Sequence, residues 1–348
     1  MLETKSDRKI VIGLHRLWHS GYPAVAYTIY ARAIGCDCYM FYPADVDLIN
    51  RKINAHVYRD GKWVDEVREY PDVIDNGDKF LNSTLDKPML VHTPHTGYLV
   101  ANKKNISDWI EADPVLRKYM IPYFEIKNGR DAVERIDKST APLFFKPTHG
   151  SLGQGIMMVS RLSDGNYELT EDKSRKVLTL QELNELMKKT LTKPYIAQRY
   201  IKSCLSSGMP FDVRIHVRRD KTTQWHIVKI YARVSLANAL TSNLATGGSM
   251  MDGKTLLRLH LGKDLGDRTY NRIVELGKII PERLQRTFRG HNFNALGIDL
   301  GIEADGSIFL FEINDYPGSQ YFMLEAASYA IDYAKTLAFN PDLAFPEV

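Results

Sequence analysis

Short apolar runs alternate with an amphipathic stretch in the first hundred residues, and this pattern predicts a small α/β unit. Residues 9–14 (KIVIGL) and 38–43 (CYMFYP) are typical of strands, while residues 22–35 have helical spacing and end in glycine. Strand, helix and strand in this order form a βαβ unit. Apolar runs around the Asp-Gly pair at 60–61 predict a hairpin, and residues 71–76 predict a further strand.

The middle of the chain carries a weaker pattern. We expect a helix over residues 102–120, a strand over 143–147 (LFFKP), a glycine-rich loop, and a strand over 155–160 (GIMMVS). The stretch from there to about Lys193 is polar and poorly patterned. This segment is interpreted as a second, smaller unit.

Strict alternation returns near residue 195 and predicts a unit built on antiparallel strands. The expected strands cover 195–201, 211–220, 224–235, 296–303 and 307–314, and the expected helices cover about 270–288 and 324–339. The domain boundaries that follow are 1–96 for an N-terminal α/β domain, 97–200 for a central subdomain and 201–348 for a C-terminal subdomain.

The expected hairpin near the C-terminus brings two carboxylates together. With Asp305-Gly306 as a two-residue loop, Asp299 lies opposite Glu312, and Asn314 follows on the same face. Like charges opposed on a sheet are destabilising, so the pair indicates a bound cation. All-oxygen ligands of this kind suit Mg²⁺ or Mn²⁺. The alternative is a solvent-exposed hairpin end, which the apolar flanks disfavour.

The glycine-rich loop has the composition of a phosphate-binding loop. Lys146 ends the preceding strand, and a lysine adds a point charge for phosphate. Glycines let main-chain N–H groups converge on an anion. A strand follows the loop, which excludes the Walker A and dinucleotide-binding motifs, because both need a helix there. A mobile hairpin turn is the alternative. The loop residues are Gly150, Ser151, Gly153, Gln154 and Gly155.

Alternation along residues 211–220 (FDVRIHVRRD) divides this strand into an apolar face and a polar face. The polar face could line a cleft, and Arg214 and Arg233 are candidates to contact an anion there. A solvated strand face is the alternative. Gly, Ser, Thr and Asn follow at residues 241–249 in a loop able to wrap a ligand. The polar face comprises Asp212, Arg214, His216 and Arg218.

Composition and charge exclude some classes of protein but do not indicate a particular kind of enzyme. The chain has 348 residues, is 44% hydrophobic, and has a net charge of +4 that is spread along the sequence. The chain has no concentrated block of Lys and Arg that would indicate binding to nucleic acid or to an anionic membrane. Three cysteines and no apolar leader lead us to expect a cytoplasmic protein without a disulfide framework. Cys36 and Cys38 lack a second Cys/His pair at zinc spacing, so we expect plain buried cysteines.

Taken in order, the motifs resemble the ATP-grasp superfamily, and within it the endospore-coat-associated YheC/YheD-like group. The resemblance covers nearly the whole chain and includes the early segments FYPADVD and VYRDGKWV. It implies an α/β and α+β protein with the ATP-grasp fold. The parts are an N-terminal Rossmann-like (pre-ATP-grasp) domain, a central lid subdomain and a C-terminal antiparallel-sheet subdomain.

The resemblance also implies roles at matching positions. Lys103, Lys146 and the loop from Gly150 to Gly155 would hold the ATP phosphates, and the stretch Gln198, Arg199, Tyr200, Ile201 would edge the adenine. Gln198 stands where many members carry Glu. Asp212 would serve the ribose or the acceptor. The catalytic candidates near the γ-phosphate are Arg214, Arg233 and Asn243, and the ligands for two Mg²⁺ (or Mn²⁺) are Asp299, Glu312 and Asn314.

The activity implied is that of an ATP-dependent ligase that joins a carboxylate to an amine or thiol through an acyl phosphate. A small-molecule kinase and a non-catalytic nucleotide-binding spore-coat protein are the alternatives. Small-molecule or peptide substrates are expected as partners, without nucleic acid or membrane, and a homodimer is left open. Residues that follow strand ends in the N-terminal domain are candidates for substrate contact: His15, Arg16, His19, Tyr22, His92 and His95.

Overall fold

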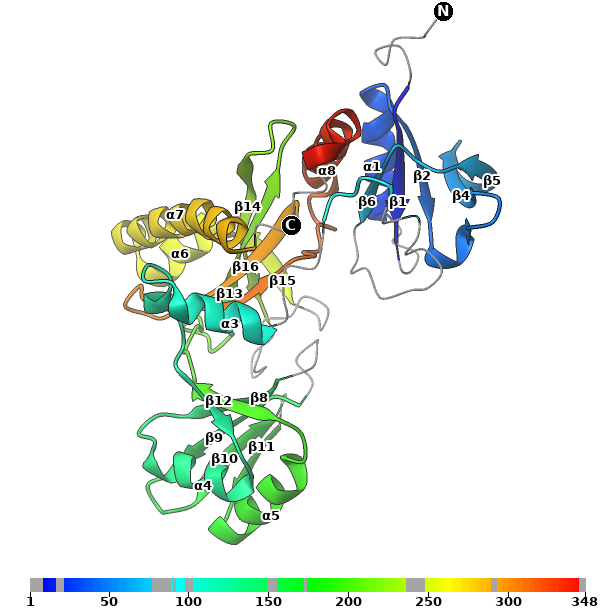
Figure 1. Cartoon of the computed structure of the whole chain (residues 1–348). Coiled ribbons are helices and arrows are strands. Elements are labelled where there is room, and N and C mark those ends of the chain that lie inside the picture. Colours follow the sequence, from blue (N-terminus) through cyan, green and yellow to red (C-terminus); the bar gives the residue numbers. More distant parts are fainter. Residues whose placement is uncertain are drawn as a thin grey trace, which may run out of the picture.

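The computed structural model describes residues 9–16, 22–76, 89, 92–97, 103–148, 155–171, 174–235, 248–288 and 293–343. These residues form three β-sheets with helices packed on them, and Figure 1 shows one lobe around each sheet. Within these ranges, every helix is too short or too polar to span a bilayer.

The N-terminal sheet has parallel strands at its centre. Strand β1 (Val11–His15) pairs in parallel with β2 (Asp37–Phe41) on one side and with β6 (Val73–Asn76) on the other. Helix α1 (Tyr22–Ala33) connects β1 to β2 along the chain, which confirms the predicted βαβ unit. The three strands run in the same direction, so their carboxyl ends meet at one edge of the sheet.

An antiparallel extension widens this sheet through β3 (Val46–Asp47), β4 (Lys52–Arg59) and β5 (Lys62–Glu69). The predicted hairpin at Asp60-Gly61 is confirmed. Both turn residues have positive φ, +48° and +81°, as the favoured two-residue turn requires. Cys36 and Cys38 are buried thiols without a disulfide, and burial raises the pKa of Cys38 to about 12.

The last helix, α8 (Met323–Phe339), joins the N-terminal lobe although it comes from the other end of the sequence. It packs beside α1 and contacts β1 and β6, and its apolar side chains share one core with theirs. The same helix also contacts a strand of the C-terminal sheet, so it lies where the two lobes meet (Figure 1).

The central sheet is antiparallel throughout, with the order β11-β10-β9-β8-β12-β7, and two helices share its core. The strands of the phosphate-loop prediction, β8 and β9, are neighbours as expected. The bounds are β7 (Tyr123–Ile126), α4 (Gly129–Lys138), β8 (Leu143–Pro147), β9 (Met157–Arg161), β10 (Tyr167–Glu171), β11 (Ser174–Leu178), α5 (Leu180–Thr190) and β12 (Tyr195–Arg199).

The polar, poorly patterned stretch up to Lys193 holds β10, β11 and α5. Strand β11 is polar because it lies at the edge of the sheet, where most of its side chains are exposed. Helix α5 does carry a local signal that the periodicity argument missed. Thr179 accepts from the N–H of Glu182, whose carboxylate accepts from the N–H of Thr179, and the two residues form a capping box.

The C-terminal sheet has the order β15-β14-β13-β16-β17, and all neighbouring strands are antiparallel. Three helices bury its apolar face in the largest core of the protein, to which β13 contributes the expected residues Phe211, Val213, Ile215 and Val217. The bounds are α3 (Lys103–Ala112), β13 (Phe211–Arg219), β14 (Trp225–Val234), β15 (Ser249–Asp252), α6 (Gly253–Leu261), α7 (Lys263–Thr287), β16 (Ala295–Ile302) and β17 (Ile308–Asn314).

Two predicted helices have other limits in the structure. The helix expected over 102–120 ends at Ala112, because Asp113-Pro114 follows and the Asp113 carboxylate accepts from the N–H of Val115 at 2.8 Å. The helix expected from residue 270 begins at Lys263 and follows a separate helix, α6. Gly262, with φ +79°, breaks the chain direction between these two helices.

Candidate functional site

The hairpin β16–β17 has a three-residue loop instead of the predicted two-residue loop. The N–H of Glu303 donates to Ser307 O at 3.1 Å, so these residues close the loop, and Gly306 occupies its left-handed position with φ +79°. Asp305 turns the loop by accepting from the N–H of Ser307 at 2.8 Å. The Asp-Gly pair therefore serves a longer turn, which offsets the strands by one residue from the register expected.

A β-bulge at Phe311 cancels this offset. Near the loop Leu300 faces Leu310, but beyond the bulge Asp299 faces Glu312. The predicted pairing of the two carboxylates is therefore confirmed, although the reasoning that led to it used the wrong loop length. The sequence does contain a signal for the bulge. The buried positions of β17 are Ile308, Leu310 and Ile313, so their spacing changes from two to three.

Two ion pairs lie side by side on the polar face of the C-terminal sheet. Arg214 donates from Nε and Nη2 to the two oxygens of Asp299 at 2.5 and 2.6 Å. Arg233 lies on β14, directly across from Asp212 on β13. It donates to both oxygens of Asp212 at 2.7 and 2.6 Å. Arg233 also reaches Asp299 at 2.9 Å, and Asn314 Nδ2 donates to Asp299 at 3.2 Å. One connected array thus links four strands.

Burial makes this array electrostatically strong. Burial alone would raise the pKa of Asp299, but the guanidinium groups of Arg214 and Arg233 hold that pKa below its usual range. Burial would likewise lower the pKa of Arg233, yet Asp299 and Asp212 raise it. Asp299 and both guanidinium groups of the array are therefore charged at neutral pH.

Two arginines supply positive charge where a metal cation was expected. The opposed carboxylates Asp299 and Glu312 were predicted to need a cation between them, and two guanidinium groups lie beside Asp299. Among the described residues, no group of three or more His, Cys, Asp or Glu side chains gathers as a metal cluster. The expected ligands are two opposed carboxylates and the amide of Asn314, an all-oxygen set of the kind that Mg²⁺ binds.

The central sheet turns a second face away from its helices, and the expected nucleotide contacts lie on it. Lys146 on β8 is directly across from Ile196 on β12, and Gln198 is across from Phe144, so alternation puts all four on one face. Their sequence neighbours Phe145 and Ala197 are buried against α4 and α5. Gln198 is itself buried, whereas Lys146 is half-buried.

The residues after Gln198 connect this lobe to the C-terminal sheet. Arg199 forms an ion pair with Glu303 at 3.0 Å and lies 4.9 Å from the centre of the Phe309 ring. Tyr200 contacts Cys204 through its hydroxyl at 3.4 Å, and Ile201 is buried. The side chain of Arg199 thus clasps the β16–β17 hairpin, a contact that the sequence analysis did not anticipate because its partner is 104 residues away.

Several expected site residues lie outside the described part of the chain: Gly150, Ser151, Gly153, Gln154, Asn243 and His19. Lys103 opens α3, but its side chain is outside the description as well. Gly155 is described, with φ +74°, and its carbonyl accepts from the Tyr195 hydroxyl at 3.0 Å. A glycine is required at this position, because any other residue would be strained there.

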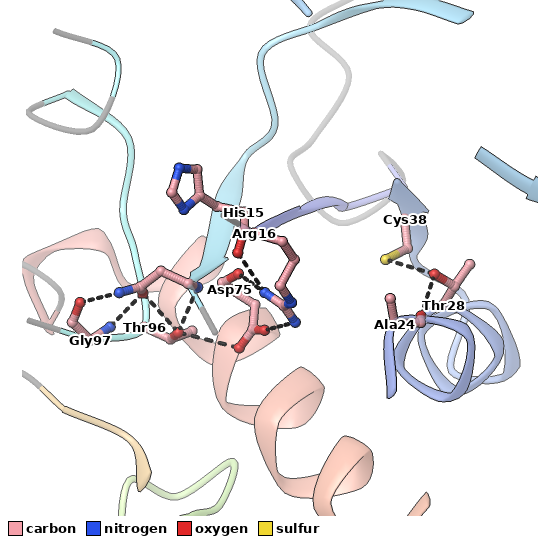
Figure 2. A network of polar contacts seen from close by, with 9 residues as sticks. His15, Arg16, Ala24, Thr28, Cys38, Asp75, Thr96 and Gly97 are labelled. Atoms are coloured by element: carbon pink, nitrogen blue, oxygen red, sulfur yellow. Dashed lines mark hydrogen bonds and ion pairs between the residues drawn. The ribbon is translucent and has the colours of Figure 1, made fainter. Parts of the chain in front are cut away.

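A polar network lies at the carboxyl ends of β1 and β6. Arg16 donates to His15 O at 2.7 Å, to Asp75 O at 2.8 Å and to the Asp75 carboxylate at 2.9 Å (Figure 2). Thr96 donates to Asp75 and Asn76, which pins the segment 92–97 onto the strand ends. Arg16, one of the residues expected to contact substrate here, is therefore paired with a carboxylate of the protein itself.

Comparison with known proteins gives three results. The model of the YheC/D like ATP-grasp family matches residues 92–337. Two Bacillus subtilis (strain 168) proteins are similar: endospore coat-associated protein YheD is 23% identical over 82% of this chain and 65% of its own length, and endospore coat-associated protein YheC is 22% identical over 80% of each. The chain therefore spans just under two thirds of the length of YheD.

One solved structure is similar over nearly the full chain. It is a Chryseobacterium gregarium RiPP-associated ATP-grasp ligase in complex with ADP and a leader and core peptide. The TM-score is 0.49 with 15% identity, and the match covers 97% of this chain and 96% of the other.

Proposed function

Because the chain belongs to the YheC/D-like ATP-grasp family, which confirms the predicted fold, we propose that it is an ADP-forming ligase that joins a carboxylate to an amine or thiol. The observation that carries the proposal is a buried array of charges on the polar face of the C-terminal sheet. The array consists of Asp212, Arg233, Arg214 and Asp299, and Glu312 lies beside it. Five charges gathered on one face are costly unless they serve a highly charged ligand.

The nucleotide would bind between two sheet faces. Lys146 on the central sheet would contact phosphate, and the strand at Gln198 would border the adenine. Support comes from their shared face, which is turned away from α4 and α5. The Arg199–Glu303 clasp supports a central lobe that stays attached to the C-terminal sheet while it closes over the ligand.

Asp299, Glu312 and Asn314 fit a magnesium site. Their donors are oxygens, and Glu312 directly opposes Asp299, so both can face the phosphate oxygens of a nucleotide. Bound Mg²⁺ would neutralise phosphate charge. Two ions would balance the four negative charges of ATP, and Mn²⁺ would substitute.

The chemistry conserves charge and atoms in two steps. A carboxylate oxygen of the substrate attacks the γ-phosphorus, and ADP leaves with the bridging oxygen. An amine or thiol then attacks the acyl carbon, the C–O bond breaks, and the departing phosphate takes up the proton that the nucleophile loses. Arg214 and Arg233 would stabilise the negative charge that builds up on the transferred group, because each guanidinium has five donors and its carboxylate partners use only some of them.

Nucleotide binding with Mg²⁺ and ADP release are the decisive measurements. Wild-type protein should bind ATP only with a divalent cation and should release ADP with a suitable carboxylate and amine. Glu312→Gln and Lys146→Ala should each lower ADP release by at least about 100-fold, since each removes a charge that faces the phosphates. Arg286→Gln, an exposed change on α7, is the matched control and should have no effect.

The alternatives give different results in the same assay. A stable phosphorylated product without an amine requirement would identify a kinase. ATP binding without ADP formation in any substrate mixture would identify a nucleotide-binding protein without catalysis. Absence of Mg²⁺-dependent nucleotide binding by the wild type, or full activity of Glu312→Gln, would refute the proposed site.

A further inference from the structure

Arg218 on β13 is a buried cation whose charge no described carboxylate balances. Its relative exposure is 7%, and its hydrogen bond is to the uncharged ring of His216, from Nε to Nε2 at 3.1 Å. Three nearby arginines each hold an acid: Arg214 holds Asp299, Arg233 holds Asp212, and Arg16 holds Asp75. Arg219, next on β13, pairs with no described acid but donates to Phe293 O, Thr223 O and Gln285. A buried charge without a partner is costly, so Arg218 requires an explanation.

The neighbours of Arg218 fix its direction without neutralising it. His216 must accept through Nε2, so its ring is neutral. Burial, together with the nearby Arg218 and Arg214, lowers the pKa of His216 well below its usual value. Phe322 packs edge-on against the other side of this ring at 4.9 Å. The guanidinium carbon of Arg218 lies 6.0 Å from the centre of the Tyr27 ring. Arg218 is thus steered toward the N-terminal lobe.

This position is where the N-terminal lobe meets the polar face of the C-terminal sheet. Tyr27 belongs to α1, and its ring also lies 5.6 Å from the guanidinium carbon of Arg16, at the end of β1. Asn76, at the end of β6, approaches the Tyr316 hydroxyl at 3.5 Å. The carboxyl ends of parallel strands and the start of a helix favour bound anions. Figure 2 shows the Asp75 carboxylate bound by Arg16, and among the described residues no ion pair joins Asp75 to Arg218.

The terminal nitrogens of Arg218 make no hydrogen bond to a described residue, while its Nε is held by His216. These two nitrogens are therefore left to donate to an oxyanion. Arg218 is also separate from the group held by Arg214. The two Cα atoms are four residues apart along β13, about 13 Å, although the pairing with β14 shifts register between them. Arg214 is fixed on Asp299.

We infer that Arg218 binds an anionic group of the acid substrate, a group distinct from the carboxylate that is phosphorylated. The inference rests on the proposed ligase function and adds the substrate class, which is acids that carry a second carboxylate or a phosphate. Arg218 supplies the charge, His216 orients it, and the junction between α1 and β13 is the binding site. Its role is in substrate affinity, because it does not contact the reacting group.

A binding experiment on the full-length protein tests this assignment. The probes are α,ω-dicarboxylic acids of increasing chain length and acidic dipeptides, each beside its monoamide and its phosphonate analogue, measured by calorimetry with Mg²⁺ and a non-hydrolysable ATP analogue. Wild-type protein should prefer a dicarboxylate to its monoamide, and Arg218→Gln should weaken that dicarboxylate at least about 30-fold. The monoamide should bind both proteins equally. Arg218→Lys should recover part of the loss, and the phosphonate series distinguishes a carboxylate anchor from a phosphate anchor.

Controls separate this inference from the proposed function. The affinity of Arg218→Gln for the nucleotide analogue and its thermal unfolding report whether the variant is folded, and Arg286→Gln is the surface control. If wild-type protein binds nucleotide but does not distinguish diacids from monoamides, or if Arg218→Gln keeps that preference, the inference is wrong and the ligase proposal stands. If nucleotide does not bind, the ligase proposal itself fails.

Discussion

At the scale of single residues, Asp299 is the centre of the charged array. It accepts from Arg214, Arg233 and Asn314 while its side chain is only 6% exposed. Removing one member of a buried ionic group leaves the opposite charges desolvated and unpaired. Asp299 therefore has a structural role in addition to the metal-binding role proposed for it, and the two roles can be distinguished by measurement.

Asp299→Asn should lower the free energy of unfolding by about 3 kcal/mol at neutral pH, because two buried guanidinium groups lose their shared anion. The pKa of Asp299 is lowered in the folded protein, so its contribution is present above the ordinary carboxyl pKa. It should fade as pH falls below about 4 and Asp299 becomes protonated. Urea unfolding of both proteins across this pH range measures the difference.

Glu312→Gln is the matched comparison, since Glu312 faces Asp299 but is half-buried, whereas Asp299 is buried. It should change stability by less than about 1 kcal/mol. Equal losses for Asp299→Asn and Glu312→Gln would contradict the assignment of Asp299 as the anchor of the array.

At the scale of elements, the β16–β17 hairpin shows two features of backbone geometry that compensate each other. The longer loop offsets the strands by one residue, and the bulge at Phe311 restores the register. The bulge also puts Phe311 and Glu312 on the same face as each other, so the Phe311 ring covers Gly301 on the neighbouring strand. The site depends on this bulge, because without it Asp299 would face Phe311.

Gly301→Ala should destabilise the protein by about 2 kcal/mol, because the added methyl group would overlap the Phe311 ring. Phe311→Ala should remove the overlap, so Gly301→Ala should cost little in that background. A double-mutant cycle from chemical denaturation gives the coupling energy, expected to be at least about 1 kcal/mol. Additive effects of the two changes would mean that Phe311 does not lie over Gly301.

At the scale of the whole molecule, α8 joins the two ends of the chain. Its buried residues complete the core that contains β1, β2 and α1, and Phe322 at its start packs on His216 and Tyr231 of the C-terminal sheet. The N-terminal lobe is therefore incomplete without α8. The junction that α8 stabilises is the one where Arg218 lies.

Ile331→Ala should lower the free energy of unfolding by about 3 kcal/mol, because Ile331 is fully buried in this shared core. Leu324→Ala on the same helix is the control, since Leu324 is 62% exposed, and it should change stability by less than about 0.5 kcal/mol. Hydrogen exchange should show faster exchange in β1 and α1 of Ile331→Ala. An effect confined to α8 would indicate that the lobe is stable without it.

The sequence by itself determined the elements whose pattern is local: the βαβ unit, the Asp60-Gly61 hairpin, and the polar and apolar faces of β13. It also determined the family, because an ordered set of motifs does not depend on how the lobes pack. Edge strands such as β11 were not predicted, since a strand exposed on both faces has no apolar alternation to detect.

Only the tertiary structure decided which charges meet. Residues 85 positions apart in Arg214–Asp299, and 104 apart in Arg199–Glu303, form contacts that no local pattern encodes. The pairing of Asp299 with Glu312 depended on a loop length and a bulge that offset each other. The contact of Arg218 with Tyr27 likewise joins β13 to α1 across the two lobes, beside the contact of α8 with β13. Pairing of distant charges follows from the packing of strands and lobes, so it is a property of the folded chain.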